Sequence, residues 1–197
     1  MKELVFLLEE ESAKAMLESL LPRILNPKIQ PRFIPFEGKQ DLERQMTKRL
    51  RGYINQQARF IVLRDQDSAP DCFTLKKKLA EHCQNAGKAE KTLVRIACRE
   101  LETFYLADLA AVEQALKING LTQRQGSAKF RNPDRLGSPS KELETLTRGN
   151  YQKVIGSREI GNFLNAANER SPSFKNLVNG IRKLEEELLN LAEAPQA

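Results

Sequence analysis

Short apolar runs and helical repeats alternate along the first part of the chain. The runs at residues 4–8 and 60–63 are continuous, which is typical of strands covered on both faces, and residues 93–98 form a fourth strand candidate. Residues 30–36 form a further strand candidate, and two prolines in it remove backbone donors and place it at a sheet edge. Between these strands, apolar positions recur at helical spacing over residues 13–21, 42–53, 75–83 and 101–116.

This alternation predicts an α/β, Rossmann-like fold. Four strand–helix repeats favour a parallel four-stranded sheet with right-handed crossovers, flanked by helices on both faces. In open sheets of this kind, ligands bind outside the carboxyl ends of the strands. We assign residues 1–118 to this domain, and we look for chemistry in the residues that follow each strand.

The remaining chain, residues 119–197, has a different pattern. Residues 120–160 are rich in turn signals and carry eight Lys or Arg against four acids. A short helix is expected over residues 157–164. Ser171-Pro172 provides a cap and a first helical residue for a last helix with one apolar face. We therefore expect a basic loop and a mainly helical extension packed on the first domain.

Composition narrows the class of protein. Lys and Arg total 32 and Asp and Glu total 26, so the net charge of +6 permits a nucleic acid partner without requiring one. No stretch approaches the roughly 18 apolar residues of a membrane span. Three glutamates within the first ten residues argue against a signal peptide. We expect a cytoplasmic protein with no membrane partner.

The cysteine and histidine content restricts the chemistry further. The three cysteines, Cys72, Cys83 and Cys98, lack CxxC spacing and are expected to be buried, reduced thiols. His82 is the only histidine, which disfavours a Cys/His zinc site and most serine-type catalysis. Any reaction is therefore expected to depend on carboxylates and a metal.

Acidic residues follow three of the four predicted strands. They are Glu9 after the first, Asp65 and Asp67 after the third, and Glu100 and Glu102 after the fourth. The carboxyl ends of parallel strands share one sheet edge, so we expect these carboxylates to converge, with Asp65 and Asp67 projecting the same way. Mg²⁺ or Mn²⁺ would relieve their mutual repulsion, because such ions prefer hard oxygen ligands. The pattern predicts metal-assisted phosphodiester hydrolysis.

A plainer interpretation of these acids also stands. Glutamates in the first turn of a helix are favoured by the helix dipole, and both Glu9-Glu10-Glu11 and the Glu100–Glu102 pair precede predicted helices. An Asp-x-Asp pair alone is common in a chain this acidic. The combination at one sheet edge is what favours a shared site.

These residues also carry a family resemblance. Strand-Glu, strand-Asp-x-Asp and alternating β/α units resemble the Toprim fold of topoisomerases, primases and overcoming-lysogenization-defect nucleases. The chain is more closely similar to the Toprim-like domain-of-unknown-function family 4276, found among prokaryotic defence and mobile-element genes. The segments that carry the resemblance are residues 6–12, 61–67 and 95–108.

The resemblance implies roles for individual residues. Glu9 would be the acid/base or metal-organising glutamate, and Asp65 and Asp67 would be Mg²⁺ ligands. Glu100 would be a further ligand, and Glu102 another candidate. Many Toprim proteins have a glycine after the first glutamate, whereas this chain has Glu10, so either Glu9 or Glu10 could be the functional acid.

Basic residues near these acids are candidates for holding a nucleic acid strand. Each of them could bind phosphate or pair with an acid, and the sequence leaves both possibilities open. Residues 129–135 form a candidate substrate-gripping loop, in which Phe130 either stacks on a base or packs in the core. The candidate phosphate contacts are Lys39, Arg64, Arg99, Lys129, Arg131 and Arg135.

Three functions follow from the sequence. The first is a Mg²⁺- or Mn²⁺-dependent nuclease acting on DNA or RNA, in the defence or mobile-element setting that the resemblance implies. The second is a non-catalytic subunit that docks on or regulates an ATPase, which would be a separate protein because the chain has no GxxxxGK[ST] loop. The third is nucleic acid binding without cleavage through residues 124–135. The apolar face of the last helix could cover the sheet or a second copy of the chain.

Overall fold

A computed structural model of the protein describes residues 1–191, and the predicted fraying of residues 193–197 falls outside this range. The sheet has four strands in the order β2-β1-β3-β4, and every neighbouring pair is parallel. This arrangement confirms the predicted fold class, with the proline-containing strand β2 at an edge as expected. The strands are β1 (Glu3–Leu8), β2 (Gln30–Pro35), β3 (Ala58–Asp65) and β4 (Thr92–Ala97).

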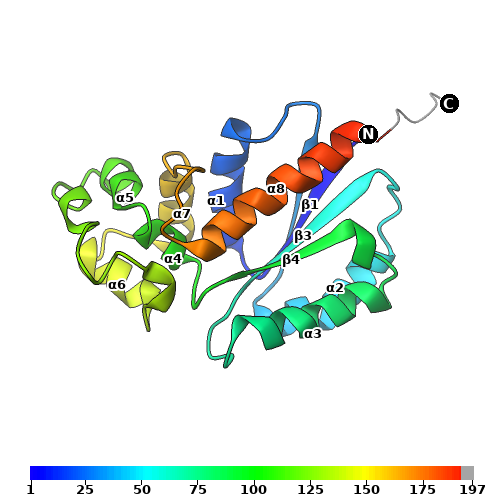
Figure 1. Cartoon of the computed structure of the whole chain (residues 1–197), viewed down its shortest axis with the longest axis horizontal. Coiled ribbons are helices and arrows are strands. Elements are labelled where there is room, and N and C mark those ends of the chain that lie inside the picture. Colours follow the sequence, from blue (N-terminus) through cyan, green and yellow to red (C-terminus); the bar gives the residue numbers. More distant parts are fainter. Residues whose placement is uncertain (192–197) are drawn as a thin grey trace.

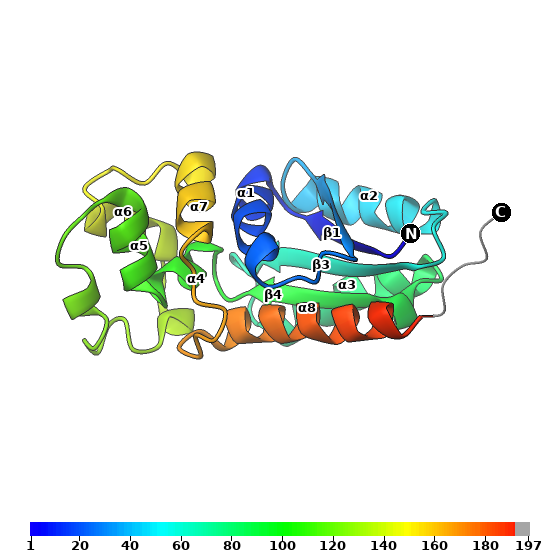
Figure 2. The ribbon, with the colours of Figure 1, turned by 90° about the horizontal axis from the view of Figure 1, so that it is seen from above.

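Helices cover both faces of this sheet (Figure 2). The helices of the described chain are α1 (Glu11–Leu20), α2 (Lys39–Arg51), α3 (Cys72–Asn85), α4 (Glu102–Leu106), α5 (Leu109–Leu116), α6 (Pro139–Leu146), α7 (Lys153–Gly161) and α8 (Pro172–Asn190), of which α1, α2, α3 and α8 contact the sheet. Alternate residues of β1 point to opposite faces, so Phe6 packs in a cluster with residues of α1 and α8, while Val5 packs with residues of α2 and α3. Single 3-10 turns lie at Leu21–Arg23, Ala89–Lys91, Thr122–Arg124 and Pro133–Arg135.

Helices α4 to α7 form a cap beyond the carboxyl ends of the strands (Figure 1). The extension contributes Leu143, Ile160 and Phe174 to the same hydrophobic cluster that contains Phe6 of β1. Helix α8 contacts β1, β3 and β4, so its apolar face covers the sheet of its own chain. Within residues 1–191, no helix is both long and apolar enough to cross a bilayer.

The helices differ from the sequence expectation at three points. The long helix predicted over residues 101–116 is broken, because Asp108 leaves helical geometry and its carboxylate accepts a hydrogen bond from Ala111 N, which starts α5. The short helix expected from Ser157 begins earlier, at Lys153. Helix α6 was not predicted, because Ser138-Pro139 was interpreted as a turn although it is the start of this helix.

All three cysteines are free thiols, but only Cys83 is buried as expected. Cys72 starts α3 and Cys98 follows β4, and both are half-buried. Their sulfur atoms lie 3.3 Å apart in a thiol–thiol contact.

Candidate active site at the carboxyl edge of the sheet

A cavity of about 350 Å³ lies at the carboxyl ends of β3 and β4, under the helical cap. We call it the acidic cavity. It brings together four of the five carboxylates predicted from the sequence, and Glu9 is the one that does not line it. The lining residues are Asp65, Asp67, Glu100, Glu102, Ser140, Glu144, Tyr151 and Lys153.

The two aspartates reach this cavity from different local structures, Asp65 from the end of a strand and Asp67 from the turn that follows it. Asp65 is the last residue of β3, and Asp67 has a positive φ of 52°. The turn is held by backbone hydrogen bonds from Gln66 N to the Ala97 oxygen (2.9 Å) and from Asp67 N to the Arg99 oxygen (2.8 Å). The extended geometry expected for this pair is wrong, but both side chains still face the cavity.

Glu9 lies next to the cavity and holds the backbone of a residue that lines it. Its Oε2 accepts a hydrogen bond from Asp65 N (3.0 Å), and Glu9 N donates to the Leu63 oxygen (3.2 Å). These bonds join the end of β1 to the end of β3. Glu10 has other partners, because its carboxylate accepts from the Ser12 hydroxyl (2.7 Å) and pairs with Lys153 Nζ (2.7 Å). Glu9 is therefore the residue that orients the aspartate loop.

Glu100 and Glu102 tie the cavity to the extension. Glu100 Oε2 accepts a hydrogen bond from Ser140 N in the first turn of α6 (2.7 Å). This is the helix N-terminus at which a carboxylate is favourable. Glu102 Oε1 accepts from the Tyr151 hydroxyl (2.9 Å), and Glu102 is almost fully buried. Each glutamate thus has one carboxylate oxygen fixed by a partner from a distant part of the chain.

Burial makes it less favourable for the carboxyl groups of this site to carry a negative charge. Burial raises the pKa of Asp65 well above its usual range, and the neighbouring carboxylates Glu9 and Glu102 raise it further. Burial also raises the pKa of Glu9 and the pKa of Glu102. A raised carboxyl pKa means that the folded chain holds these negative charges at a cost, which a bound cation would reduce.

The sequence reasoning missed the positive charge of the cavity. Lys153, the first residue of α7, places its ammonium group against Glu10 at the rim. Burial acts to lower the pKa of Lys153, but the hydrogen bond and charge of Glu10, with the charges of Glu102 and Asp65, outweigh it and raise the pKa. Lys153 is therefore a fixed cation among carboxylates. Its position 53 residues after Glu100 offered no local sequence signal.

Two of the predicted phosphate contacts near the sheet pair with acids. Lys39 Nζ lies 3.1 Å from Asp67 Oδ2. Arg64 is buried beneath the site, with Nη2 3.4 Å from Glu43 Oε1 and Nε 3.9 Å from Glu9 Oε2. A third, Arg99, is half-buried and has a positive φ of 66°, and its backbone N donates to the Gln66 side chain (3.2 Å).

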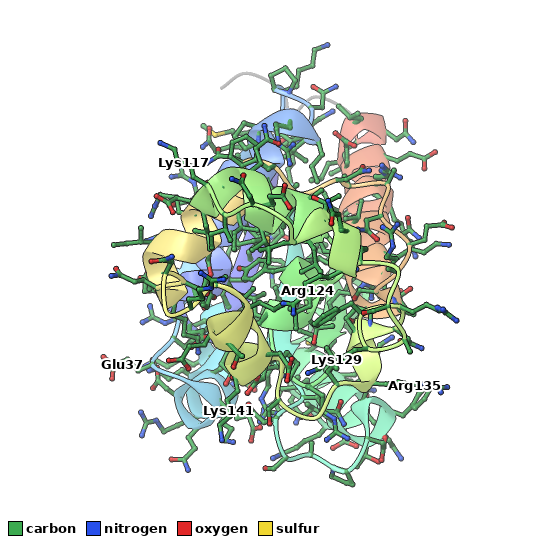
Figure 3. All side chains as sticks on the ribbon, turned by 90° about the vertical axis from the view of Figure 1, so that its left-hand side faces the viewer. Glu37, Lys117, Arg124, Lys129, Arg135 and Lys141 are labelled. Atoms are coloured by element: carbon green, nitrogen blue, oxygen red, sulfur yellow. The ribbon has the colours of Figure 1, made fainter. Side chains whose placement is uncertain are left out.

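The other three predicted contacts lie on the outer face of the cap. Arg131 and Arg135 are exposed, and Lys129 forms an ion pair with Glu142 (2.6 Å). Phe130 is buried in the core, so the base-stacking alternative for this residue is wrong. Figure 3 shows this face of the molecule with Arg124, Lys129, Arg135 and Lys141 on it.

The donor chemistry of the acidic cavity fits a hard divalent cation. Its carboxylate oxygens are the ligands that Mg²⁺ and Mn²⁺ prefer, and burial, together with repulsion from neighbouring carboxylates, raises the pKa of Asp65. The arrangement is not preassembled, since no group of three or more His, Cys, Asp or Glu within residues 1–191 is placed to hold a metal ion. Asp67, Glu100 and Glu102 instead hold protein partners. Metal binding would therefore require these side chains to rearrange.

Comparisons with known proteins agree with this description. The model of a family described as a domain of unknown function, DUF4276, matches residues 8–182. The chain is similar in structure to the C-terminal region of the OLD protein of Burkholderia pseudomallei, with a TM-score of 0.52 and 15% sequence identity. The match covers 92% of this chain and 98% of that one. Among curated proteins, no sequence matches the chain. The predicted family and Toprim-like fold are both confirmed.

Proposed function

The chain belongs to the DUF4276 family, and on this premise we propose that it is a metal-dependent nuclease that hydrolyses phosphodiester bonds in DNA or RNA. The observation that supports the proposal most is the convergence of Asp65, Asp67, Glu100 and Glu102 on one cavity. They come from the chain at the ends of two different strands, β3 and β4, and they accumulate negative charge where burial opposes it. The similarity in fold to an OLD protein favours the same class of chemistry.

The carboxylates in and beside the cavity have two roles under this proposal, metal binding and positioning. Asp65 and Asp67 would hold a Mg²⁺ or Mn²⁺ ion, with Glu100 and Glu102 as further oxygen donors. The bound cation would stabilise negative charge on the phosphate oxygens under attack. Glu9 orients the Asp65 loop through the backbone bond at Asp65 N. It is a positioning residue, because it does not line the cavity.

Lys153 adds a cation that the protein itself supplies. Its ammonium group lies at the rim of the acidic cavity, where a phosphodiester of the substrate would approach. Phosphate binding there would compete with Glu10 for the lysine. The remaining parts of the proposal are a nucleic acid partner, a cytoplasmic location and a role in a prokaryotic defence or mobile-element system.

A cleavage assay tests the proposal. Purified protein is incubated with plasmid DNA, single-stranded DNA and transfer RNA in Mg²⁺ or Mn²⁺, beside the double variant Asp65→Ala/Asp67→Ala. The control variant is Glu81→Ala/Glu90→Ala, which removes two exposed carboxylates away from the cavity. We expect cleavage by the wild type and the control, and none by the double variant. Equal cleavage by all three proteins would refute the assignment.

The second candidate is a non-catalytic subunit that docks on or regulates a separate ATPase. The protein partners already held by Asp67, Glu100 and Glu102 favour it, as does Glu10 in place of the Toprim glycine. Isothermal titration calorimetry with Mn²⁺ separates the two candidates. Binding that is lost in Asp65→Ala/Asp67→Ala supports the nuclease, and no binding at millimolar metal supports the docking subunit.

A further inference from the structure

A second cavity, of about 320 Å³, adjoins the acidic cavity and has a different chemistry. It lies between the start of α2, the loop after β3 and the side of α3 that faces α2. Asp67 lines both cavities, so the two hollows meet at this side chain. The lining residues are Lys39, Glu43, Arg64, Gln66, Asp67, Ser68, Ala69, Pro70, Thr74, Leu75 and Lys78.

The charge of this second cavity is positive. Lys39, Arg64 and Lys78 contribute three cations, against the two carboxylates Glu43 and Asp67. Lys39 and Lys78 are about half exposed, with 44% and 56% of their side-chain surfaces accessible, so both ammonium groups can reach a ligand. Each lysine is held by one carboxylate, Lys39 by Asp67 (3.1 Å) and Lys78 by Glu43 (2.7 Å).

Arg64 contributes a buried positive charge to this cavity, and its guanidinium group is only partly hydrogen-bonded within the described chain. Only 7% of its side chain is exposed, and its Nε and Nη1 atoms have no hydrogen-bond partner within the described part of the chain. The nearest carboxylate oxygens are 3.4 Å and 3.9 Å away, at ion-pair distances rather than short hydrogen bonds. A buried, incompletely paired guanidinium is costly, and an anion above it would offset part of that cost.

We propose that the second cavity binds a backbone phosphate of the nucleic acid strand, next to the phosphate that the acidic cavity would cleave. This inference rests on the proposed function and adds a substrate subsite to it. Lys39 and Lys78 would donate to the phosphate oxygens, and Thr74 would lie beside them with its hydroxyl group. Arg64 would act through its charge from below the cavity floor.

The shared aspartate couples the two cavities. In the structure, Asp67 holds Lys39 and so competes with any phosphate for that lysine. When Asp67 turns to a cation in the acidic cavity, the second cavity retains three cations and one carboxylate, and Lys39 is released. Cation binding on one side of Asp67 therefore promotes phosphate binding on the other side.

Fluorescence anisotropy with a short, labelled single-stranded DNA tests the subsite. The titrations are made in EDTA, so that binding is measured without metal-dependent cleavage. Lys39→Ala/Lys78→Ala is compared with Lys48→Ala/Arg49→Ala, which removes the same charge from the far end of α2. We expect about tenfold weaker binding for the first variant, with a salt slope lower by about 0.7 for one lost phosphate contact. The control should change affinity less than about twofold.

The coupling makes a second prediction of opposite sign. Asn tolerates positive φ, so Asp67→Asn keeps the turn while it removes the carboxylate that holds Lys39. We expect this variant to bind the DNA about threefold more tightly in EDTA, on the scale of one half-exposed ion pair. The gain should vanish in Asp67→Asn/Lys39→Ala. Circular dichroism melting checks that each variant is folded.

Three results would overturn the subsite. They are no binding by the wild type, equal weakening in Lys39→Ala/Lys78→Ala and in its control Lys48→Ala/Arg49→Ala, and a gain in Asp67→Asn that persists without Lys39. These results are independent of whether the protein cleaves. A protein with the Lys39-dependent pattern that never cleaves would contradict the proposed nuclease and leave the phosphate subsite standing.

Discussion

The contact between α1 and α7 offers a direct test of how the cavity is held together. Gly161, the last residue of α7, lies against α1, and a Cβ atom there would be 2.6 Å from the Met16 oxygen and 2.9 Å from Ser19 Cβ. Ordinary contact starts at 3.4 Å, so Gly161→Ala must displace α7 or α1 by several tenths of an ångström. Overpacking of this kind costs about 1–3 kcal/mol. The better helix propensity of Ala offsets about 0.5–1 kcal/mol.

We therefore expect Gly161→Ala to lower the free energy of unfolding by about 1–2 kcal/mol. Urea denaturation followed by circular dichroism measures this change. The matched control is Gly126→Ala, where an added Cβ meets no atom within 4 Å, and which should stay within about 0.5 kcal/mol of wild type. Displacement of α7 also shifts Lys153, so DNA cleavage should fall in Gly161→Ala and not in the control. Wild-type stability and cleavage in Gly161→Ala would refute this account of the α1–α7 contact.

Three further predictions concern charges and thiols. In the folded chain, burial raises the pKa of three carboxyl groups. Each group therefore contributes its full stabilisation of the fold below its ordinary pKa near 4, where it is protonated, and loses that contribution as the pH rises through its raised pKa. In EDTA, Asp65→Asn should therefore gain stability over wild type toward neutral pH, and an unchanged difference between urea midpoints at pH 4 and pH 7 would contradict this. The carboxyl groups concerned are Glu9, Asp65 and Glu102. Glu100→Ala removes the acceptor for Ser140 N and should cost about 1 kcal/mol in urea unfolding, whereas no loss would mean that the bond does not support α6. Burial raises the pKa of Cys83 to about 11, so mass spectrometry should find iodoacetamide on Cys72 before Cys83, and the reverse order would show that Cys83 is accessible.

The sheet could be predicted because its signals are local. Continuous apolar runs marked β1 and β3, a mostly apolar run marked β4, and the prolines of β2 marked an edge. The group of helices α4 to α7 was harder to predict, because short helices depend on the residues at their ends more than on apolar periodicity. The same Ser-Pro pattern starts α6 and α8, but only the second is followed by a long apolar face, and only the second was predicted as a helix.

In the candidate site too, some residues could be predicted from the sequence and others depend on how distant segments pack. Four carboxylates were placed together by one topological rule, which needs only the strand order and direction. Lys153 and Tyr151 were missed, because their approach to the cavity depends on how α7 packs against α1. The role of Glu9 also differed, since a backbone hydrogen bond to Asp65 N leaves no trace in sequence spacing.

The acidic cavity takes its lining from both halves of the chain, and this has a consequence during protein synthesis. The aspartates leave the ribosome well before Lys153 and α8, which supplies part of the hydrophobic cover of β1, β3 and β4. A nascent chain therefore carries its aspartates on a sheet that lacks part of its hydrophobic cover until α8 has emerged. The acidic cavity is complete only after Tyr151 and Lys153 have been synthesised and α7 has packed against α1, so a shorter nascent chain carries the carboxylates without the lysine that lies among them.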